Sequence, residues 1–283
     1  MAARMAEPLI NRHRTISEEL GVLMRKSFMC ISALVFSLAL TGQAGAVGLE
    51  LAVGAWHQSL GGELGYEIDN NNDIIDLDQE LDFDDEWRVT GRANIDLPLF
   101  FPNIYLMASP MEFKGTGSKS ATFSFGDIEF AADADLDVKV TMNQYDIAFY
   151  WGIPLLKKAT NDVFNIDLGL NVRIIDLEAT VSGEEDLTST IVEEDVSATV
   201  PLPMLFVALQ IEPTDSIGIA LEGRAISIGD NKLYSLIGRF RYQFAGPVFA
   251  AAGYRYDTLE IDEEDVVADV DFSGPFVELG LIF

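Results

Sequence analysis

The residue with the clearest potential for catalysis is His57, which is followed by Ser59 and by many carboxylates. A histidine supported by a serine and an aspartate can activate a nucleophile, as many hydrolases require. His57 is the only histidine beyond residue 46. A lone histidine is more often a polar side chain without a chemical role, so we predict no catalytic residue.

A second candidate is the acidic stretch that offers Asp69, Asn71, Asp73 and Glu80 as oxygen donors. Their spacing is that of a calcium-binding loop. However, Ile74 stands at the sixth position, where such a loop needs glycine for its sharp turn. The stretch is therefore predicted to be a solvated acidic loop. Weak divalent-cation binding is the lesser alternative, and we assign no metal site and no cofactor.

The largest polar set consists of charged residues that alternate with apolar residues. In the segment Leu233–Phe244, one parity carries Tyr234 and Tyr242, and the other carries Arg239 and Arg241. A period of two is typical of a β-strand, whose successive side chains point to opposite faces. The charged faces of such segments hold Arg88, Arg92, Asp96, Asp167, Arg173, Glu222, Arg224, Arg239, Arg241, Arg255, Asp257 and Glu278.

These charged faces indicate the interior of a barrel. An arginine or lysine that faces the middle of a bilayer costs about 2–4 kcal/mol. The opposite faces of the same segments carry apolar residues between aromatic ends, which is the pattern of a lipid-facing strand. Because a buried charge without a partner is strongly destabilising, we expect the arginines and carboxylates to pair as lumen charges.

The strands that would position these residues are visible as ten alternating segments. Each meets the roughly 9–11 residues that a tilted membrane strand needs. The predicted strands cover 47–58, 86–97, 103–115, 136–151, 163–181, 192–211, 217–228, 232–244, 248–261 and 269–283.

The connections between these segments alternate in length. Short connections lie at 98–103, 212–216 and 245–247, whereas long acidic ones cover 59–85, 116–135, 182–191 and 262–268. Short turns on one side and long loops on the other are typical of outer-membrane barrels, although the link at 229–231 is short on the long-loop side. We predict an all-β fold, an antiparallel up-and-down transmembrane β-barrel of about ten strands. Eight or twelve strands stay open, because 116–135 contains further alternating stretches.

A soluble, secreted β-sandwich is the alternative fold, since it too has alternating strands. Aromatic residues at the ends of the apolar faces and charges in the middle of the opposite faces favour the barrel.

The N-terminal region predicts export. Residues 24–46 combine a basic start, an apolar core and the small residues Ala44, Gly45 and Ala46, which is the pattern of a signal peptide cleaved near Ala46. Residues 1–23 are interpreted as an extension that is not translated or as an atypical part of the signal. Residues 47–283 are then the barrel.

Composition excludes one class of partner. The chain has 46 acidic and 18 basic residues and a net charge of −28. So acidic a protein does not bind nucleic acid non-specifically, because the phosphates repel it. The single cysteine, Cys30, lies inside the predicted signal peptide, so no disulfide is expected.

The most specific motif is the C-terminus, where Val277, Leu279 and Leu281 precede a final Phe283. It resembles the C-terminal assembly signature of Gram-negative outer-membrane β-barrel proteins, and the chain is similar in layout to a small uncharacterised family of them. The resemblance implies that the barrel-assembly machinery recognises the last strand. It also implies location in the cell outer membrane. We expect a monomer among outer-membrane lipid and lipopolysaccharide.

For function, the sequence predicts a structural protein or a narrow, porin-like conduit for small solutes, with acidic extracellular loops. Side chains fill barrels of about eight strands, while roughly 16–18 strands leave a channel. About ten strands therefore favour a filled or very narrow lumen. The competing class is an enzyme at the outer rim, either lipid A-modifying or an omptin-like protease, which would use His57. No matching motif of those enzyme families is present.

Overall fold

The computed structural model describes residues 47–66, 74–77, 81–98, 100–118, 122–125, 128–153, 155–186, 190–229, 231–263 and 266–283. The chain divides into two units, Met1–Ala46 and Val47–Phe283. The predictions made for 1–23 and 24–46 lie outside the described residues. Among those that are described, no helix has the length and hydropathy needed to cross a membrane.

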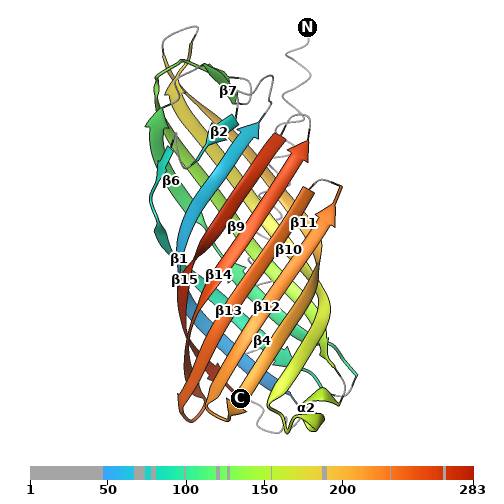
Figure 1. Ribbon diagram of the computed structural model, residues 1–283. Helices are drawn as coiled ribbons and strands as arrows, with labels where there is room; N and C mark the ends of the chain where they lie inside the picture. Colours follow the sequence, from blue (N-terminus) through green and yellow to red (C-terminus); the bar gives the residue numbers. More distant parts are fainter. Residues whose placement is uncertain are drawn as a thin grey trace, which may run out of the picture. The chain divides into compact units, whose positions relative to one another are not determined.

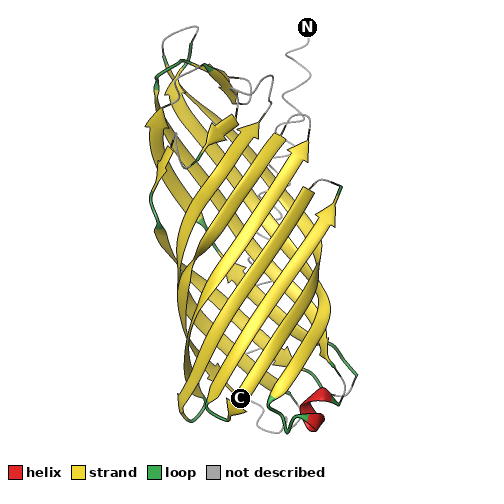
Figure 2. Cartoon of the chain, in the orientation of Figure 1, coloured by secondary structure: helices red, strands yellow, loops and turns green. Residues whose placement is uncertain are grey.

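Long antiparallel strands close into a barrel (Figures 1 and 2). Each strand pairs with the next around the ring, and β15 closes the ring by pairing with β1. Over the described residues the ring has ten members, which confirms the predicted fold and strand number. They are β1 (Gly48–Tyr66), β4 (Glu86–Asp96), β5 (Asn103–Ser109), β9 (Asp135–Gly152), β10 (Phe164–Glu184), β11 (Ile191–Thr214), β12 (Ile217–Ile228), β13 (Asn231–Ala245), β14 (Val248–Glu263) and β15 (Val266–Ile282).

Short elements extend this ring. Beyond Pro110, β6 (Glu112–Ser118) continues along β9 where β5 leaves off. Two short strands join the same sheet: β3 (Leu81–Phe83) pairs with β6, and β2 (Ile74–Asp76) pairs with β1. A separate hairpin is formed by β7 (Phe123–Phe125) and β8 (Ile128–Phe130). The short helix α2 (Leu156–Ala159) lies in the connection between β9 and β10.

The predicted long acidic connections are wrong over much of their length, because the strands continue into them. Strand β1 runs to Tyr66, β10 runs to Glu184, and β14 and β15 leave only a short gap between Glu263 and Val266. The acidic side chains in these stretches alternate with apolar ones, and a charged residue on the outer face of a strand is compatible with water outside. The predicted strand 103–115 is also interrupted, since Pro110 has no N–H to donate to a ladder.

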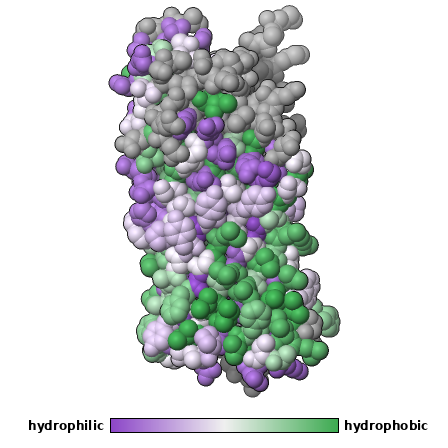
Figure 3. All heavy atoms as spheres, in the orientation of Figure 1, coloured by the Kyte–Doolittle hydropathy of each residue, from purple (hydrophilic) through white to green (hydrophobic). Residues whose placement is uncertain are grey.

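The outer surface divides the barrel into two halves. We call the half near the connections at 97–102, 153–163, 215–216 and 246–247 the belt half, and the opposite half the distal half. On β10, the belt half exposes Leu168 and Leu170, whereas the distal half exposes Asp176 and Glu178. Figure 3 shows the same division on one face, apolar below and polar above. The strands are thus longer than their apolar outer band.

The interior is divided in the opposite sense. The distal half contains a buried apolar core in which Phe113 packs against Phe272, with ring centroids 5.7 Å apart. Met111, Phe125 and Phe130 are among the side chains that are fully buried in this core. The belt half buries charged and amide side chains as well as apolar ones such as Phe206 and Phe249. This polar interior is the candidate functional site.

Candidate functional site

The buried charges of the belt half lie at alternate positions of neighbouring strands, facing inward. We call nine of them the central charge cluster, and each side chain is less than one-tenth exposed. They come from β4, β9, β10, β12, β13, β14 and β15 and are Arg92, Asp146, Arg173, Glu222, Arg224, Arg239, Arg255, Asp257 and Glu278. So many buried charges require mutual pairing, because an unpaired one is strongly destabilising.

Arg173 of β10 connects three strands. Its Nε and Nη2 donate to the two carboxylate oxygens of Asp146 on β9, at 2.9 and 3.0 Å. Its Nη1 lies 3.4 Å from Asp257 Oδ2 on β14, and its Nη2 donates to Ser235 Oγ on β13 at 3.3 Å. A two-point contact between a guanidinium and a carboxylate fixes both distance and orientation, so this residue holds its partners in one geometry.

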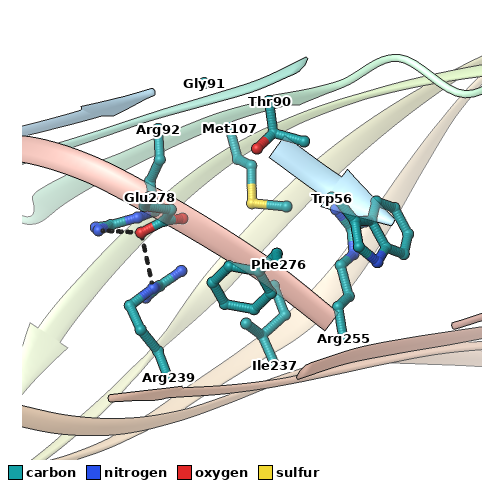
Figure 4. A pocket seen from close by; sticks show the side chains of 10 residues that line it. All are labelled: Trp56, Thr90, Gly91, Arg92, Met107, Ile237, Arg239, Arg255, Phe276 and Glu278. Carbon is teal, nitrogen blue, oxygen red and sulfur yellow. Dashed lines mark hydrogen bonds and ion pairs between the residues drawn. The ribbon is translucent and has the colours of Figure 1, made fainter. Parts of the chain in front are cut away.

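Glu222 and Glu278, like Asp257, are each shared by two arginines. Glu222 accepts from Arg224 at 3.2 Å and also from Arg239. Glu278 Oε2 lies 3.1 Å from both Arg92 Nη2 and Arg239 Nε (Figure 4). These shared contacts link β4, β12, β13 and β15 into one chain of alternating charge.

Arg255 of β14 reaches the opposite wall. Its Nη2 lies 2.6 Å from Asp257 Oδ2 on its own strand. The same nitrogen donates to Gln144 Oε1 on β9, and Nη1 donates to Ser109 Oγ on β5, both at 2.6 Å. The guanidinium also lies over the Trp56 ring, 4.4 Å from its centroid, a stacked contact that stabilises a cation.

A second arginine makes aromatic contacts across the interior. Arg224 of β12 lies over the ring of Tyr105 on β5, 4.7 Å from its centroid, and 5.1 Å from that of Phe206. Its Nη1 and Nε have no hydrogen-bond partner among the described residues. The faces of these two rings therefore stabilise a guanidinium that leaves some of its N–H groups without hydrogen bonds.

The remaining predicted lumen charges lie at the edges of this cluster. Arg241 pairs with Glu50 at 3.1 Å and with Glu212 at 2.6 Å, close to the short turns. Asp167 accepts from Asn165 at 2.6 Å and from Gln210 at 2.8 Å.

Two predicted residues lie apart. Asp96 is exposed, and the Tyr150 hydroxyl lies 3.5 Å from its Oδ1. Arg88 is partly exposed and pairs with Glu112 at 3.4 Å and Glu86 at 3.8 Å. The structure therefore brings together most of the predicted set but not these two.

Sequence reasoning missed several partners. Asp146 is the most important, because it binds Arg173 and lies 4.0 Å from Arg224. The signal that could have found it is the alternation within 136–151, where Gln144, Asp146 and Ala148 share one parity. Glu50 could have been found in the same way in the first strand.

The candidate catalytic histidine lies outside the barrel interior. The His57 ring packs edge-on against Trp87, with centroids 5.0 Å apart, and its Nε2 lies 3.9 Å from Asp85 Oδ2. Ser59 makes no hydrogen bond to His57 in the described part of the chain. Asp69, Asn71, Asp73 and Glu80 of the candidate calcium loop lie outside the described residues, which contain no cluster of three or more metal-ligating side chains.

The C-terminal strand occupies the closing position of the ring. Val277, Leu279, Leu281 and Phe283 are exposed on the outer surface of the belt half. Phe283 N donates to Leu49 O at 2.8 Å, and Leu49 N donates to Phe283 O at 3.1 Å. The last residue is thus paired with the start of the first strand.

No family model and no curated protein matches this chain. Similar solved structures include the translocator domain of the autotransporter NalP from Neisseria meningitidis, with 10% identity, a TM-score of 0.42, and coverage of 91% of this chain and 95% of that one. The outer membrane protease OmpT from Escherichia coli is 7% identical, with a TM-score of 0.47 and coverage of 85% and 97%. Ail, the attachment invasion locus protein of Yersinia pestis, is 8% identical, with a TM-score of 0.32 and coverage of 84% and 99%. At such identities nothing of their activities transfers to this chain.

Proposed function

We propose that this chain is an integral outer-membrane β-barrel protein that spans the membrane with its belt half and keeps its lumen closed. Its role is structural, and it is not a solute channel. The distal half then projects beyond the membrane on the outside of the cell, since the short turns of such barrels face the periplasm.

The outer surface of the belt half supports membrane insertion. Its exposed side chains include Val53, Leu170, Leu221 and Leu279, each more than half exposed. So large an exposed apolar surface would drive aggregation in water, whereas it is stable in contact with acyl chains. Exposed aromatic residues accompany them on several strands and include Trp87, Trp151, Tyr242, Phe244, Tyr254 and Phe283. Aromatic girdles at the two interfaces are typical of membrane barrels.

The observation that carries the closed lumen is the set of contacts between opposite walls. In the ring order, β14 and β9 are separated by half of the circumference, yet Arg255 donates to Gln144 at 2.6 Å. Likewise, Arg224 of β12 lies over the Tyr105 ring of β5. Side chains that meet across the barrel occupy the path that a solute would take.

Charge pairing makes such a closure stable. Each carboxylate of the central charge cluster has at least one arginine within 3.4 Å. Opening a channel would separate these pairs and leave charges without partners, which is costly in a low-dielectric interior.

Planar-bilayer recording tests the proposal. The purified protein should insert into the bilayer and give conductance close to background. Steady single-channel steps from the parent protein, with an ion selectivity that moves toward cations in Arg239→Ala, would refute a closed lumen and favour a narrow conduit. The heat-modifiable migration typical of folded barrels serves as the control that the protein has assembled.

A further inference from the structure

Strand β11 extends far beyond its neighbour on one side. Its ladder with β10 runs without a break from Ile191 to Ile211, whereas its ladder with β12 begins only at Leu205. In Figure 1 the orange β12–β13 hairpin ends below the tips of β14 and β15. From Ile191 to Met204, therefore, β11 has a strand neighbour on one side only among the described residues. We call the uncovered side of this stretch the β11 edge.

Two prolines account for the point at which the β11–β12 ladder begins. Pro201 and Pro203 have no N–H to donate, and a proline in a sheet is confined to an edge whose N–H side faces solvent. Leu205, two positions after Pro203, is the first residue of β11 that pairs with β12. The last residues of β12, 226–228, pair with β13 but not with β11 in the described part of the chain. The local sequence thus places an edge in the wall of the distal half.

Parity shows which backbone groups face the β11 edge. Glu212 N donates to Val163 O at 2.7 Å, and Thr190 O accepts from Glu185 N at 2.9 Å, so the even-numbered residues point toward β10. In an antiparallel ladder, successive residues turn their N–H and C=O groups to opposite sides. The odd-numbered residues therefore face the β11 edge, where the described part of the chain offers them no strand partner. Above the two prolines they are Ile191, Glu193, Asp195, Ser197 and Thr199.

The inner face of this stretch is apolar and incompletely covered. Val200 lies opposite Ile175 of β10, and Ile175 is buried, yet Val200 is 43% exposed. Further down the same face, where β12 is present, Phe206 is buried. Val192 and Val196 pack against the distal core but are only partly buried. A further strand along the β11 edge would remove apolar surface from water, which favours its addition.

The outer face of the same stretch is acidic. Glu193 and Asp195 are exposed there, and Asp176 and Glu178 are exposed on the same face of β10. Side chains of opposite charge stabilise each other across neighbouring strands, whereas like charges directly opposite are destabilising. A strand added beside Glu193 and Asp195 should therefore carry basic side chains on its outer face.

The charges also decide between a second copy of the chain and another partner. Prolines and charged side chains are devices that keep an exposed strand edge from pairing with copies of itself. On the β11 edge the prolines reach only to Pro201, and the charges beyond it have one sign. They repel a second copy and attract a basic segment. The net charge of −28 acts in the same direction.

We propose that the β11 edge binds an extended segment of a partner protein by strand addition, and that this segment alternates basic and apolar residues. Its backbone pairs with β11 between Ile191 and Thr199, a length sufficient for a strand of about five or six residues. Its basic side chains lie beside Asp195, and its apolar side chains cover Val196 and Val200. Main-chain hydrogen bonds supply affinity, and the alternating side chains supply specificity. In the placement proposed above, the partner approaches from outside the cell.

Binding of a fluorescein-labelled heptapeptide of alternating lysine and valine tests the proposal by fluorescence anisotropy. The purified protein, folded in a zwitterionic detergent, should bind this peptide saturably. A peptide with glutamate in place of lysine should bind about tenfold more weakly or worse. Two further peptides carry N-methyl groups either on every lysine nitrogen or on every valine nitrogen of the backbone. Their affinities should differ by about tenfold or more, because only one of the two sets of N–H groups faces β11.

Matched variants of Ser197 test the position of the site. Ser197→Pro removes an N–H that faces the β11 edge and keeps the ladder with β10, as Pro201 and Pro203 already do. It should weaken binding of the basic peptide by about tenfold or more. Ser197→Ala keeps that N–H and should change binding by less than about twofold. If Ser197→Pro fails to assemble, Thr199→Pro removes the next N–H on the same edge and should give the same loss.

Three results would overturn the proposal: equal binding of the two N-methylated peptides, equal binding of the basic and acidic peptides, or equal binding to Ser197→Pro and Ser197→Ala. The first and the third would mean that the peptide is held by general attraction to an acidic surface and not by strand pairing. The second would mean that charge does not select the partner. Strand addition needs no open lumen, so any of these results would leave the closed barrel intact.

Discussion

Strand β9 carries Asp137 and Lys139 outside and Val138 and Val140 inside along the distal half, but Phe149 outside and Asp146 inside along the belt half. Strand β10 makes the same exchange, from Glu178 outside and Val181 inside to Leu170 outside and Arg173 inside. In both strands the side chains alternate between the inner and outer faces without interruption. The two halves of one wall therefore have opposite chemistry.

In the membrane placement proposed above, the medium outside the wall determines which side chains the wall can enclose. Beside water, the distal half follows the rule of a soluble protein, with apolar side chains buried, each worth about 1.5–3 kcal/mol when fully buried. Beside lipid, apolar side chains gain little by turning inward, so the belt half can place them outside. Its interior is then available for charges, provided that every charge is paired.

A substitution inside the belt half should reduce stability the most. Arg173→Ala should lower the free energy of unfolding by about 3–5 kcal/mol, because Asp146 and Asp257 lose a buried partner. Urea unfolding in lipid vesicles measures this change. Lys232→Ala is the control, because it breaks a pair with Glu260 at 2.6 Å that is partly exposed, and should cost about 1 kcal/mol or less. Equal costs would show that the central charge cluster is not sealed from water.

Substitutions on the outer surfaces of the two halves should differ almost as much in their effect on stability. Leu170→Lys places a charge on the apolar band and should cost about 2–4 kcal/mol. Glu178→Lys, eight positions further along the same face of β10, should change stability by less than about 0.5 kcal/mol. A small cost for Leu170→Lys would place that part of the wall in water.

A smaller effect is expected from a polar substitution inside the distal half. Val140→Thr preserves the shape of the side chain but buries a hydroxyl among apolar neighbours, so it should cost about 1–3 kcal/mol. Asp137→Thr on the outer face of the same strand is the control and should stay within about 0.5 kcal/mol. A neutral Val140→Thr would mean that water reaches the distal interior.

The smallest effect concerns pH and the outer face of the distal half. Desolvation raises the pKa of Glu112, but the nearby Lys139, Arg88 and Lys114 outweigh it and hold the pKa below its ordinary value of 4.5. The stabilisation is therefore present above pH 4.5 and is lost as the pH falls through the lowered pKa. Glu112→Gln should reduce stability by less than about 1 kcal/mol at pH 7, and the difference from the parent should vanish in acid. A difference that persists in strong acid would point to a cause other than charge.

The barrel and its strand number could be predicted from the sequence because alternation reports the two faces of a strand directly. The ends of the strands could not be predicted from the sequence in the same way. Residues such as Glu63 and Glu184 are predicted to lie in acidic loops, yet in the structure they are exposed residues of β1 and β10. The alternation continues into these stretches, but the prediction interpreted their acidity as the mark of a loop.

The candidate site could be predicted by type but not by pairing. Alternation places Arg173 and Arg255 on inward faces, but it does not show how far along the barrel axis each side chain lies. Strand register and tilt decide that Arg255 meets Gln144 on the opposite wall. Arg88 has the inward parity of Arg92, yet it lies beyond the end of the β4–β5 ladder and contacts Glu112, which follows Pro110. Such an interruption depends on several strands at once and leaves little trace in one segment.

We propose that the outer face of the wall passes from water to lipid at the level where charged side chains become the main buried polar groups of its interior. Spin labels at Lys139, Tyr145 and Phe149, all on the outer face of β9, test it in reconstituted membranes. We predict that a label at Lys139 collides mainly with a water-soluble nickel complex and a label at Phe149 mainly with oxygen dissolved in lipid, with the change between Thr141 and Tyr145. Lipid-like or water-like accessibility at all three positions would contradict the account.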